Sequence, residues 1–421
     1  MAAVIDVDSH VHEPAAVWDE YVPPGDRERV RRAFCAVTAP DGTVTTTLNG
    51  RPAKGLNRSK VNRQAIWRPG MTIEQIGDLD PDTGHELNPG AWDAAARLAD
   101  MDAMGIDRAV VYPTLLNEYL AQVEDKDAAT ILCRAYNDWV WDLAEGGGGR
   151  LHPVAMLALQ DPAAALDELE RAHAKGFRAA LLRPAFYKVA DAGDSIGAQM
   201  LRMQAELIAG TEVPDTIPLF VEDRPFRPLF ARCAELGVVA CVHPAANVTG
   251  PDAVSSGGFA ERVSERVGVR HSVAEPIAYM QDADLFMTAS FFHGLFEDLP
   301  SLHVAIVHAG TTWVPLALEK CETYLWLGAG GGVPVCLEPE EVWDRHPVLT
   351  SFDSWERPVA RMVERIGQKA AWGSRYPHHD TGTPAQARAM LESSGVEEGT
   401  IDRLLGGYAA EIFGLAVPAG R

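Results

Sequence analysis

The feature that most constrains the fold is a repeated unit in which an amphipathic helix ends at a glycine and a short buried strand follows. The segment 92–104 has apolar residues at helical spacing, Gly105 follows it, and the next run, 106–113, is apolar and rich in β-branched residues. The same order recurs at 162–176 and 178–183, at 228–237 and 238–243, and at 358–367 and 369–374. A glycine allows the left-handed backbone that closes a helix. Helices that alternate with buried strands indicate βα units around a parallel sheet.

About eight strands are expected, near residues 4, 109, 153, 179, 239, 304, 348 and 370. This number favours the α/β class and a closed (β/α)8 TIM barrel over an open doubly wound sheet. A chain of 421 residues fits one barrel with insertions, so we expect a single domain over 1–421. The insertions are expected at 36–90, after the first strand and with a hairpin near Asn49-Gly50, and at 244–275. No GxGxxG motif follows a strand, which argues against dinucleotide binding.

The charge balance excludes some classes of partner. The formal net charge is −22, and such a surface repels phosphate backbones and anionic headgroups, so we expect no binding to nucleic acid or membranes. The first residues, MAAVIDVDSHVHEP, lack the basic and long apolar stretches of a signal peptide, and no segment approaches the ~18 apolar residues of a membrane span. The six cysteines form no CxxC pair, as expected for reduced thiols in a cytoplasmic protein.

Three of the expected strands end in a histidine, namely His10, His243 and His308. In a barrel, such positions deliver side chains to the carboxyl-terminal mouth, where active sites lie. Within the first strand, the side chains of Asp8, His10 and His12 share one face. Imidazole and carboxylate groups suit Zn²⁺ or Mn²⁺. The sequence therefore predicts an active site, with a possible metal ion, around the three histidines.

Six segments together resemble one known family. They are DVDSHVHEP at 6–14, ARLADMDAMGIDRAVVYPT at 96–114, AYNDWV at 135–140, RPLFARCAELGVVACVHPA at 227–245, GLFEDLPSLHVAIVHAGTTWVP at 294–315 and WGSRYPHHD at 372–380. The chain resembles the decarboxylase and hydrolase branch of the amidohydrolase superfamily (amidohydrolase-2), to which aminocarboxymuconate-semialdehyde decarboxylase belongs. The resemblance implies a distorted (β/α)8 barrel, a small-molecule substrate and a homodimer.

The resemblance also implies roles for individual residues. Aligned on the Glu-Pro pair that follows, the two metal ligands of the first strand correspond to Asp8 and His10, whereas an HxH alignment selects His10 and His12. His243 matches the ligand on the fifth strand. His308, in VHAGTTWVP, matches the histidine that acts as acid or base, or that polarises the nucleophile and substrate.

The last segment departs from the family pattern. Where the family has Gly-Ser-Asp-Tyr-Pro-His, this chain has Arg375 in place of the carboxylate that binds the metal or handles a proton. An arginine stays protonated and cannot ligate a cation. Asp380 or His378 could substitute as a ligand, Arg375 could pair with Asp8 in place of a metal, or Arg375 could clamp a substrate carboxylate. If Arg375 instead points away, the chain is an inactive relative.

Three functions are compatible with these residues. The first is a metal-dependent decarboxylase or hydrolase of a small carboxylated, aromatic or cyclic compound, with Zn²⁺ or Mn²⁺ as cofactor. The second is a metal-free lyase, isomerase or cyclase that uses His308, Arg375 and Asp8. The third is a non-catalytic binding or scaffold protein that keeps the barrel. The predicted site residues are the metal ligands Asp8, His10 and His243, the catalytic His308 and Asp380, and the substrate-binding Arg375, His12 and Arg183.

Overall fold

Parallel strands lie at all the predicted positions. The computed structural model describes residues 3–38, 44–52, 61–80, 82–185, 187–189, 195–208, 217–245, 275–328 and 338–416. The strands are β1 (Ile5–His10), β5 (Arg108–Tyr112), β6 (Leu151–Pro153), β7 (Ala155–Met156), β8 (Ala179–Leu181), β11 (Val239–Val242), β12 (Val304–Ile306), β13 (Val348–Phe352) and β14 (Ala370–Trp372). Nearly all of their residues are buried, which explains their apolar sequences. The predicted α/β class is confirmed.

The strands form two parallel sheets, in the orders β1-β5-β6 and β14-β13-β12-β11-β8-β7. On one side, only Val154 separates β6 from β7, and its N–H donates to a carbonyl of β5 (3.0 Å). On the other side, Arg375 N donates to Asp8 O (2.7 Å) and His10 N donates to Tyr376 O (2.6 Å), which joins the end of β14 to β1. Neighbouring strands thus follow the order of the chain. The strand ladder is interrupted at both edges, so one closed barrel stays a prediction.

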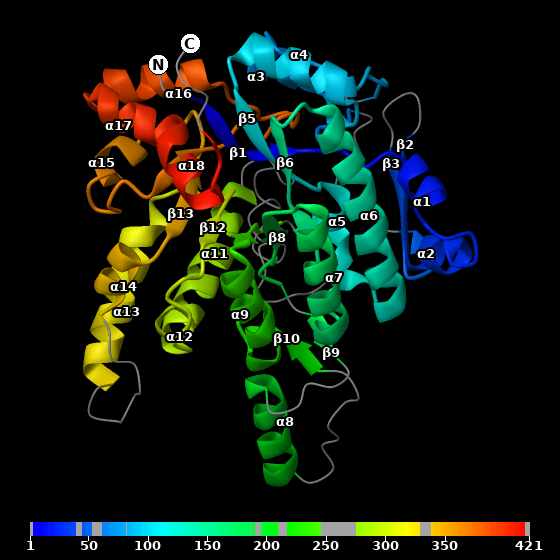
Figure 1. Ribbon diagram of the computed structural model, residues 1–421, viewed down its shortest axis with the longest axis vertical. Coiled ribbons are helices and arrows are strands. Elements are labelled where there is room, and N and C mark those ends of the chain that lie inside the picture. Colours follow the sequence, from blue (N-terminus) through cyan, green and yellow to red (C-terminus); the bar gives the residue numbers. More distant parts are fainter. Residues whose placement is uncertain are drawn as a thin grey trace.

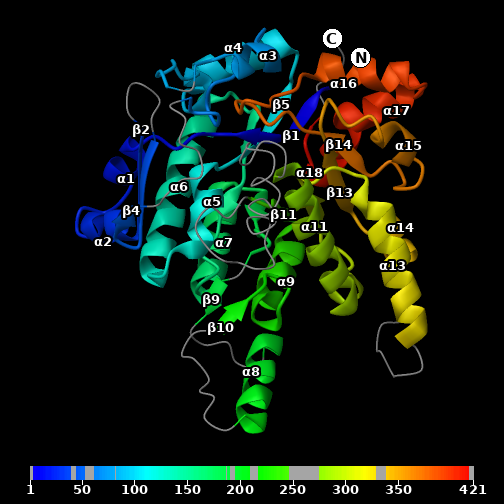
Figure 2. The ribbon, with the colours of Figure 1, turned by 180° about the vertical axis from the view of Figure 1, so that it is seen from behind.

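Helices connect the strands and surround the sheets (Figures 1 and 2). The longer ones are α4 (Ala94–Met104), α6 (Lys126–Gly146), α7 (Pro162–Lys175), α8 (Ile196–Leu207), α9 (Arg227–Leu236), α11 (Glu275–Phe292), α13 (Trp313–Gly328) and α16 (Pro384–Ser393). The shorter ones are α1 (Ala16–Glu20), α2 (Arg27–Ala33), α3 (Ile73–Gly77), α5 (Leu115–Tyr119), α12 (Leu295–Asp298), α14 (Pro339–Arg345), α15 (Val359–Met362), α17 (Glu398–Asp402) and α18 (Tyr408–Phe413).

The glycines end the helices as predicted. Gly105 closes α4 with φ 76°, and Gly237 closes α9 with φ 65°, both in the left-handed region. Asp161 caps α7 directly before its predicted proline. The predicted helix 358–366 is regular only over Val359–Met362, and the rest of that segment forms turns.

The insertion after β1 forms a small antiparallel sheet of β2 (Phe34–Thr38), β3 (Val44–Leu48) and β4 (Arg51–Pro52). Asn49 and Gly50 connect β3 to β4 with φ 49° and 74°, which confirms the predicted hairpin. Phe34 already pairs with Leu48, so this sheet begins before the expected boundary at residue 36. Most of the second predicted insertion, 246–274, lies outside the described residues.

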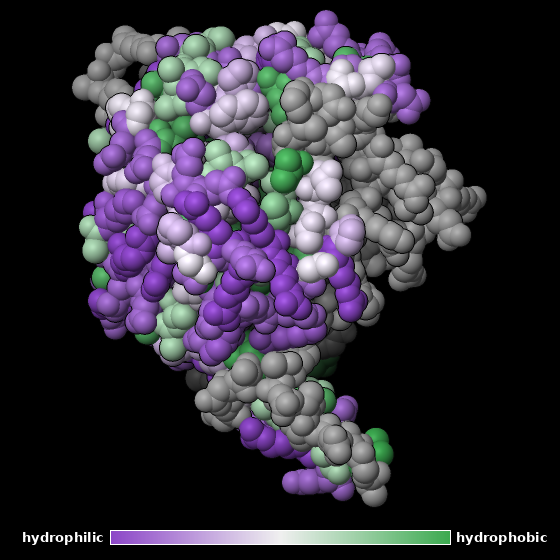
Figure 3. Space-filling view, turned by 90° about the vertical axis from the view of Figure 1, so that its right-hand side faces the viewer, coloured by the Kyte–Doolittle hydropathy of each residue, from purple (hydrophilic) through white to green (hydrophobic). Residues whose placement is uncertain are grey.

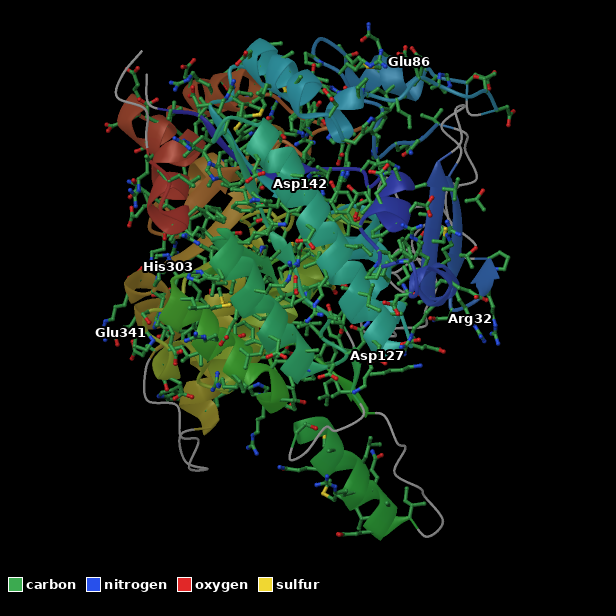
Figure 4. All side chains as sticks on the ribbon, turned by 45° about the vertical axis from the view of Figure 1, so that its right-hand side comes forward. Arg32, Glu86, Asp127, Asp142, His303 and Glu341 are labelled. Atoms are coloured by element: carbon green, nitrogen blue, oxygen red, sulfur yellow. The ribbon has the colours of Figure 1, made fainter. Side chains whose placement is uncertain are left out.

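The first two helices lie against the outside of α6. Tyr21 Oη donates to Asp142 Oδ2 (2.8 Å), and Arg29 forms ion pairs with Asp125 (2.6 Å) and Asp127 (2.7 Å). Figure 4 labels Asp127 and Asp142 toward opposite ends of α6, so these contacts hold α1 and α2 along its length.

The surface of the described residues is largely hydrophilic on the face shown in Figure 3. Figure 1 shows α8 below the body. It follows β9 (Tyr187–Val189) and precedes β10 (Ile217–Leu219) in the chain, and these two strands pair in antiparallel orientation. Among the described residues, no helix combines the length and the hydropathy needed to cross a lipid bilayer.

Candidate active site

Asp8 and His10 extend from the buried end of β1 toward the same side. Every residue of Ile5–His10 is buried, and alternate side chains share a face. The pairing with β5 shifts register between Asp6 and Ser9, a local irregularity that contains Asp8. Asp8 Oδ1 lies 3.1 Å from His10 Nε2. The strand therefore presents a carboxylate and an imidazole next to each other.

His243 and His308 complete a group of four. His243 follows β11, and its Nε2 lies 3.4 Å from Asp8 Oδ1 and 3.2 Å from His10 Nε2. His308 comes two residues after β12, and its Nδ1 lies 3.1 Å from Asp8 Oδ2. The rings of His243 and His308 stack with centroids 4.8 Å apart. One potential ligand atom from each of the four buried side chains lies within 4.8 Å of the others.

Backbone carbonyls orient two of the imidazoles. His10 Nδ1 lies 3.2 Å from Pro113 O, and His243 Nδ1 lies 2.6 Å from Pro244 O. Because a carbonyl oxygen only accepts, each Nδ1 carries the proton, and each Nε2 turns a lone pair toward the other at 3.2 Å. Two such lone pairs beside a carboxylate repel one another unless a cation lies between them. The donor set and its orientation fit a divalent metal ion.

The environment sets the charges of the group. Burial raises the pKa of Asp8, but its interactions with His308, His10 and His243 outweigh this and hold that pKa well below its ordinary value. Burial lowers the pKa of His308 to about 3, with a further contribution from the charge of Arg375. Burial also lowers the pKa of His243. Near neutral pH, Asp8 is ionised and His243 and His308 are neutral, which are the states that ligate metals.

Arg375 follows β14 and is held between two carboxylates. Its Nη1 donates to Asp380 Oδ2 (2.6 Å) and its Nη2 donates to Asp353 Oδ2 (3.1 Å). Burial raises the pKa of Asp380, but the charge of Arg375 outweighs it and lowers that pKa. Within the described residues, the guanidinium forms no salt bridge with Asp8, contrary to one expectation, because these two carboxylates take both ends of its fork. Asp380 also lies outside the group of four.

Two residues of the site have strained backbone. Arg375 has φ 61° and His308 has φ 66°, and they are two of the four non-glycine residues with positive φ in the described chain. Such conformations cost roughly 1–3 kcal/mol and cluster at functional sites.

The comparison with known families matches nearly the whole chain. A family model described as amidohydrolase matches residues 7–415. The chain belongs to the amidohydrolase family. This confirms the resemblance drawn from the six segments. No curated protein matches the chain.

Solved structures share the fold at low identity. An amidohydrolase from Mycobacterium avium subsp. paratuberculosis K-10 is 20% identical, with a TM-score of 0.74 and 99% of each chain covered. A 5-carboxyvanillate decarboxylase from Sphingomonas paucimobilis is 18% identical, with a TM-score of 0.61 and 99% of this chain and 100% of that chain covered. A dihydroxybenzoic acid decarboxylase from Polaromonas sp. JS666, with bound manganese and the inhibitor 2-nitroresorcinol, is 16% identical, with a TM-score of 0.60 and coverage of 99% and 98%.

One further histidine of this amidohydrolase, His378, lies beside the group of four. His378 stacks on His10 with ring centroids 4.3 Å apart, and its Nε2 lies 3.2 Å from Thr114 Oγ1. His12 lies beyond the last residue of β1, and its Nε2 is 3.3 Å from Asn62 Nδ2. Burial lowers the pKa of His12 to about 4. Neither histidine belongs to the group of four.

Arg183 is buried at the end of β8 and contacts backbone. Its Nη1 donates to Glu118 O (2.9 Å) and its Nη2 donates to Ala245 O (2.9 Å). Ala245 comes two residues after His243 in the chain. The guanidinium thus connects the segment after β11 to α5, and the predicted contact of Arg183 with the substrate stays a prediction.

Sequence reasoning missed Asn117 and Glu13. Asn117 Nδ2 lies 3.0 Å from His243 Nδ1, although Asn117 belongs to α5. Glu13 accepts from three successive N–H groups, those of residues 114–116 at the start of α5 (3.2, 2.9 and 3.0 Å). The sequence could have marked Glu13 as a site residue, because it lies in the same polar segment as Asp8. Asn117 has none.

Proposed function

We propose that this amidohydrolase is a metal-dependent decarboxylase of a small carboxylated aromatic or cyclic compound. The observation that carries the proposal is the convergence of Asp8, His10, His243 and His308, whose ligand atoms lie within 4.8 Å of one another. The fold shared with decarboxylases of dihydroxybenzoic acid and 5-carboxyvanillate supports this reaction class.

Asp8, His10 and His243 would hold the ion. Carboxylate and imidazole donors suit both Zn²⁺ and Mn²⁺, and the dihydroxybenzoic acid decarboxylase contains manganese. When bound, a divalent ion supplies positive charge that holds the substrate carboxylate and a neighbouring oxygen.

A neutral His308 would relay the proton that decarboxylation requires, because its Nε2 would first take a proton from a substrate hydroxyl or from water and then pass it to the ring carbon. Breaking the carbon–carbon bond leaves an electron pair on the ring carbon, which must then be protonated. His308 Nδ1 donates to Asp8 Oδ2 at 3.1 Å, so Nε2 is the atom that can accept and return a proton. The ionised Asp8 orients the ring for this exchange.

Arg375 favours decarboxylation over hydrolysis. A hydrolase needs a general base at its position, and a guanidinium cannot accept a proton at usable pH. Asp380 and Asp353 each engage one end of the fork and so fix it beside His308. The remaining donors of the guanidinium suit a substrate carboxylate. We propose His12 and Arg183 as further substrate contacts.

The test is carbon dioxide release from 2,6-dihydroxybenzoate and 5-carboxyvanillate by protein loaded with Mn²⁺ or Zn²⁺. We expect release that stops after chelation and in His10→Ala. His303→Ala is the matched control, because His303 precedes β12 at the opposite end from His308 and contacts Ile412 O (2.8 Å). Release that persists in metal-free protein would contradict the metal dependence. If metal-loaded protein releases no carbon dioxide, this result would contradict the proposed decarboxylase activity.

A metal-free lyase, isomerase or cyclase is the second candidate. The charge of Arg375 favours it, because a fixed cation close enough to act on His308 also repels a divalent ion in the same site. This candidate predicts activity that survives chelation and disappears in Arg375→Ala. An Arg375→Asp variant that gains metal and decarboxylase activity would count against it.

We also propose a homodimer, as the family resemblance suggests, and a cytoplasmic location, in keeping with the free cysteines of the described residues. Light scattering should give a mass twice that of one chain, and a monomer at micromolar concentration would contradict the dimer.

A further inference from the structure

We propose that Arg97, which the catalytic account does not use, is a positioning residue that sets the metal affinity of the site through the backbone of β1. This inference rests on the proposed metal site. Arg97 belongs to α4 and is fully buried. Its guanidinium donates to Gly90 O (2.8 Å), to Ser9 Oγ (3.0 Å) and to His10 O.

The contact with His10 O completes the fixation of this ligand. His10 N donates to Tyr376 O (2.6 Å), and His10 Nδ1 donates to Pro113 O (3.2 Å). The backbone N–H, the backbone carbonyl and the distal ring nitrogen of His10 therefore each have a partner on a different element. Only Nε2, the candidate ligand atom, is left to face Asp8 and His243.

Arg97 also reaches the turn that carries Arg375. The Arg97 guanidinium lies over the ring of Tyr376, 4.9 Å from the centroid. One turn further along α4, Asp100 Oδ2 accepts from Tyr376 Oη (2.5 Å), and Asn88 Nδ2 donates to the same hydroxyl (2.9 Å). A single face of α4 thus holds the end of β1 and the residue after Arg375 in one arrangement.

The chemistry of this contact argues for geometry rather than stability. Arg97 is fully buried, so a cation placed there loses solvation free energy, and burial lowers its pKa. Its direct hydrogen-bond acceptors are neutral oxygens, so no ion pair within the described residues offsets that cost at contact distance. A methionine would fill similar space without it. What the guanidinium supplies is a planar fork that fixes three oxygens at once.

The experiment compares Arg97→Met and Arg97→Lys with the wild type by calorimetric titration of metal-stripped protein with Mn²⁺ and Zn²⁺, well below the unfolding temperature. Outer contacts of metal ligands typically contribute about 10–100-fold in affinity. We expect Arg97→Met to weaken binding at least tenfold and Arg97→Lys to weaken it less. The visible spectrum of Co²⁺-loaded protein should also change, because it reports ligand geometry.

Lys369→Met is the matched control. Lys369 is also a buried cation that donates to three backbone carbonyls, those of Trp343, Asp344 and His346, but it lies at the start of β14. The Lys369→Met variant should unfold at a lower temperature than the wild type and bind Mn²⁺ with wild-type affinity.

Three results would overturn the inference. Wild-type affinity and an unchanged Co²⁺ spectrum in Arg97→Met would overturn this inference and leave the proposed function standing. If Arg97→Met does not fold, the same result in Arg97→Lys would do so. A wild-type protein that binds neither Mn²⁺ nor Zn²⁺ would contradict the proposed function, and this inference with it.

Discussion

At the scale of single residues, His243 is held by two groups at Nδ1, and these decide where its other nitrogen points. Pro244 O lies 2.6 Å away and Asn117 Nδ2 lies 3.0 Å away. Asn117 Oδ1 is buried without a hydrogen-bond partner within the described residues. Turning the amide over would let this oxygen accept from Nδ1–H, which is the stronger arrangement.

We therefore predict that Asn117→Leu weakens Mn²⁺ binding about tenfold, the usual effect of removing an outer contact of a metal ligand. Calorimetric titration measures this affinity. Asn137→Leu is the control, because Asn137 is equally buried but contacts Met156 and Glu168. Wild-type affinity in Asn117→Leu would show that Pro244 alone orients His243.

Arg375 stabilises two carboxylates that would otherwise face each other without a cation. We predict that Arg375→Met lowers the free energy of unfolding by about 2 kcal/mol, less than for a fully buried pair because Asp353 and Asp380 are partly exposed. It should also abolish turnover, whereas Arg375→Lys should recover part of the stability. Urea unfolding of the three proteins measures the difference. Equal stability of Arg375→Met and wild type would mean that these ion pairs contribute nothing.

The sequence predicted that four side chains lie together, but not their partners, and those four are Asp8, His10, His243 and His308. Strand alternation groups Asp8, His10 and His12 without distinguishing them, and His12 lies elsewhere because β1 ends at His10. The pairing of Arg375 with Asp353 and the contact of Asn117 with His243 join residues 22 and 126 positions apart. Such contacts depend on how the elements pack, which no local pattern encodes.

At the scale of elements, the site depends on how closely β14 approaches β1. A Cβ atom at Gly373 would lie 2.5 Å from Asp8 Cβ. We predict that Gly373→Ala costs about 1–3 kcal/mol of stability and displaces Asp8 enough to weaken Mn²⁺ binding. Gly399→Ala is the control, since a Cβ there meets nothing within 4 Å. Thermal unfolding and metal titration measure the two effects. An unaffected Gly373→Ala would show that the strands can separate freely.

The elements themselves were well predicted, because their signals are local. Buried runs and helical spacing located the parallel strands, and glycines marked the ends of α4 and α9. The irregular insertion was harder. Its hairpin followed from Asn49-Gly50, but the start of its sheet at Phe34 did not, because Phe34 directly follows α2.

At the scale of the whole molecule, the site joins the two ends of the chain. Asp6 accepts from Ser374 N (2.8 Å) and Ser374 Oγ (2.5 Å), a contact between residues 368 positions apart. His243 and His308 then come from the middle of the chain. The strand count predicted that these positions would share one edge of a parallel sheet. Closure of the two sheets into a barrel depends on pairing that the sequence pattern does not contain.

The stability of the molecule should depend on pH through Glu356. Its Oε1 accepts from Thr311 N (2.8 Å) and Thr311 Oγ1 (2.5 Å), and burial raises its pKa from 4.5 to about 7. The folded state holds the carboxyl proton of Glu356 more tightly than the unfolded state does. The protonated carboxyl therefore contributes its full stabilisation below pH 4.5, and this stabilisation is lost as the pH rises to about 7. Glu356→Gln keeps the acceptor and removes the titration. We predict that the free energy of unfolding of Glu356→Gln, relative to that of the wild type, rises by roughly 1–2 kcal/mol between pH 4.5 and 7. A pH-independent difference in urea unfolding would contradict this assignment.

The most direct test of the central claim is X-ray diffraction from crystals grown with Mn²⁺, measured at its absorption edge. We predict one anomalous peak per chain between the Asp8 carboxylate and Nε2 of His10 and His243, and no such peak in His10→Ala. A wild-type map without a peak there, with Arg375 turned to pair with Asp8, would contradict the metal site.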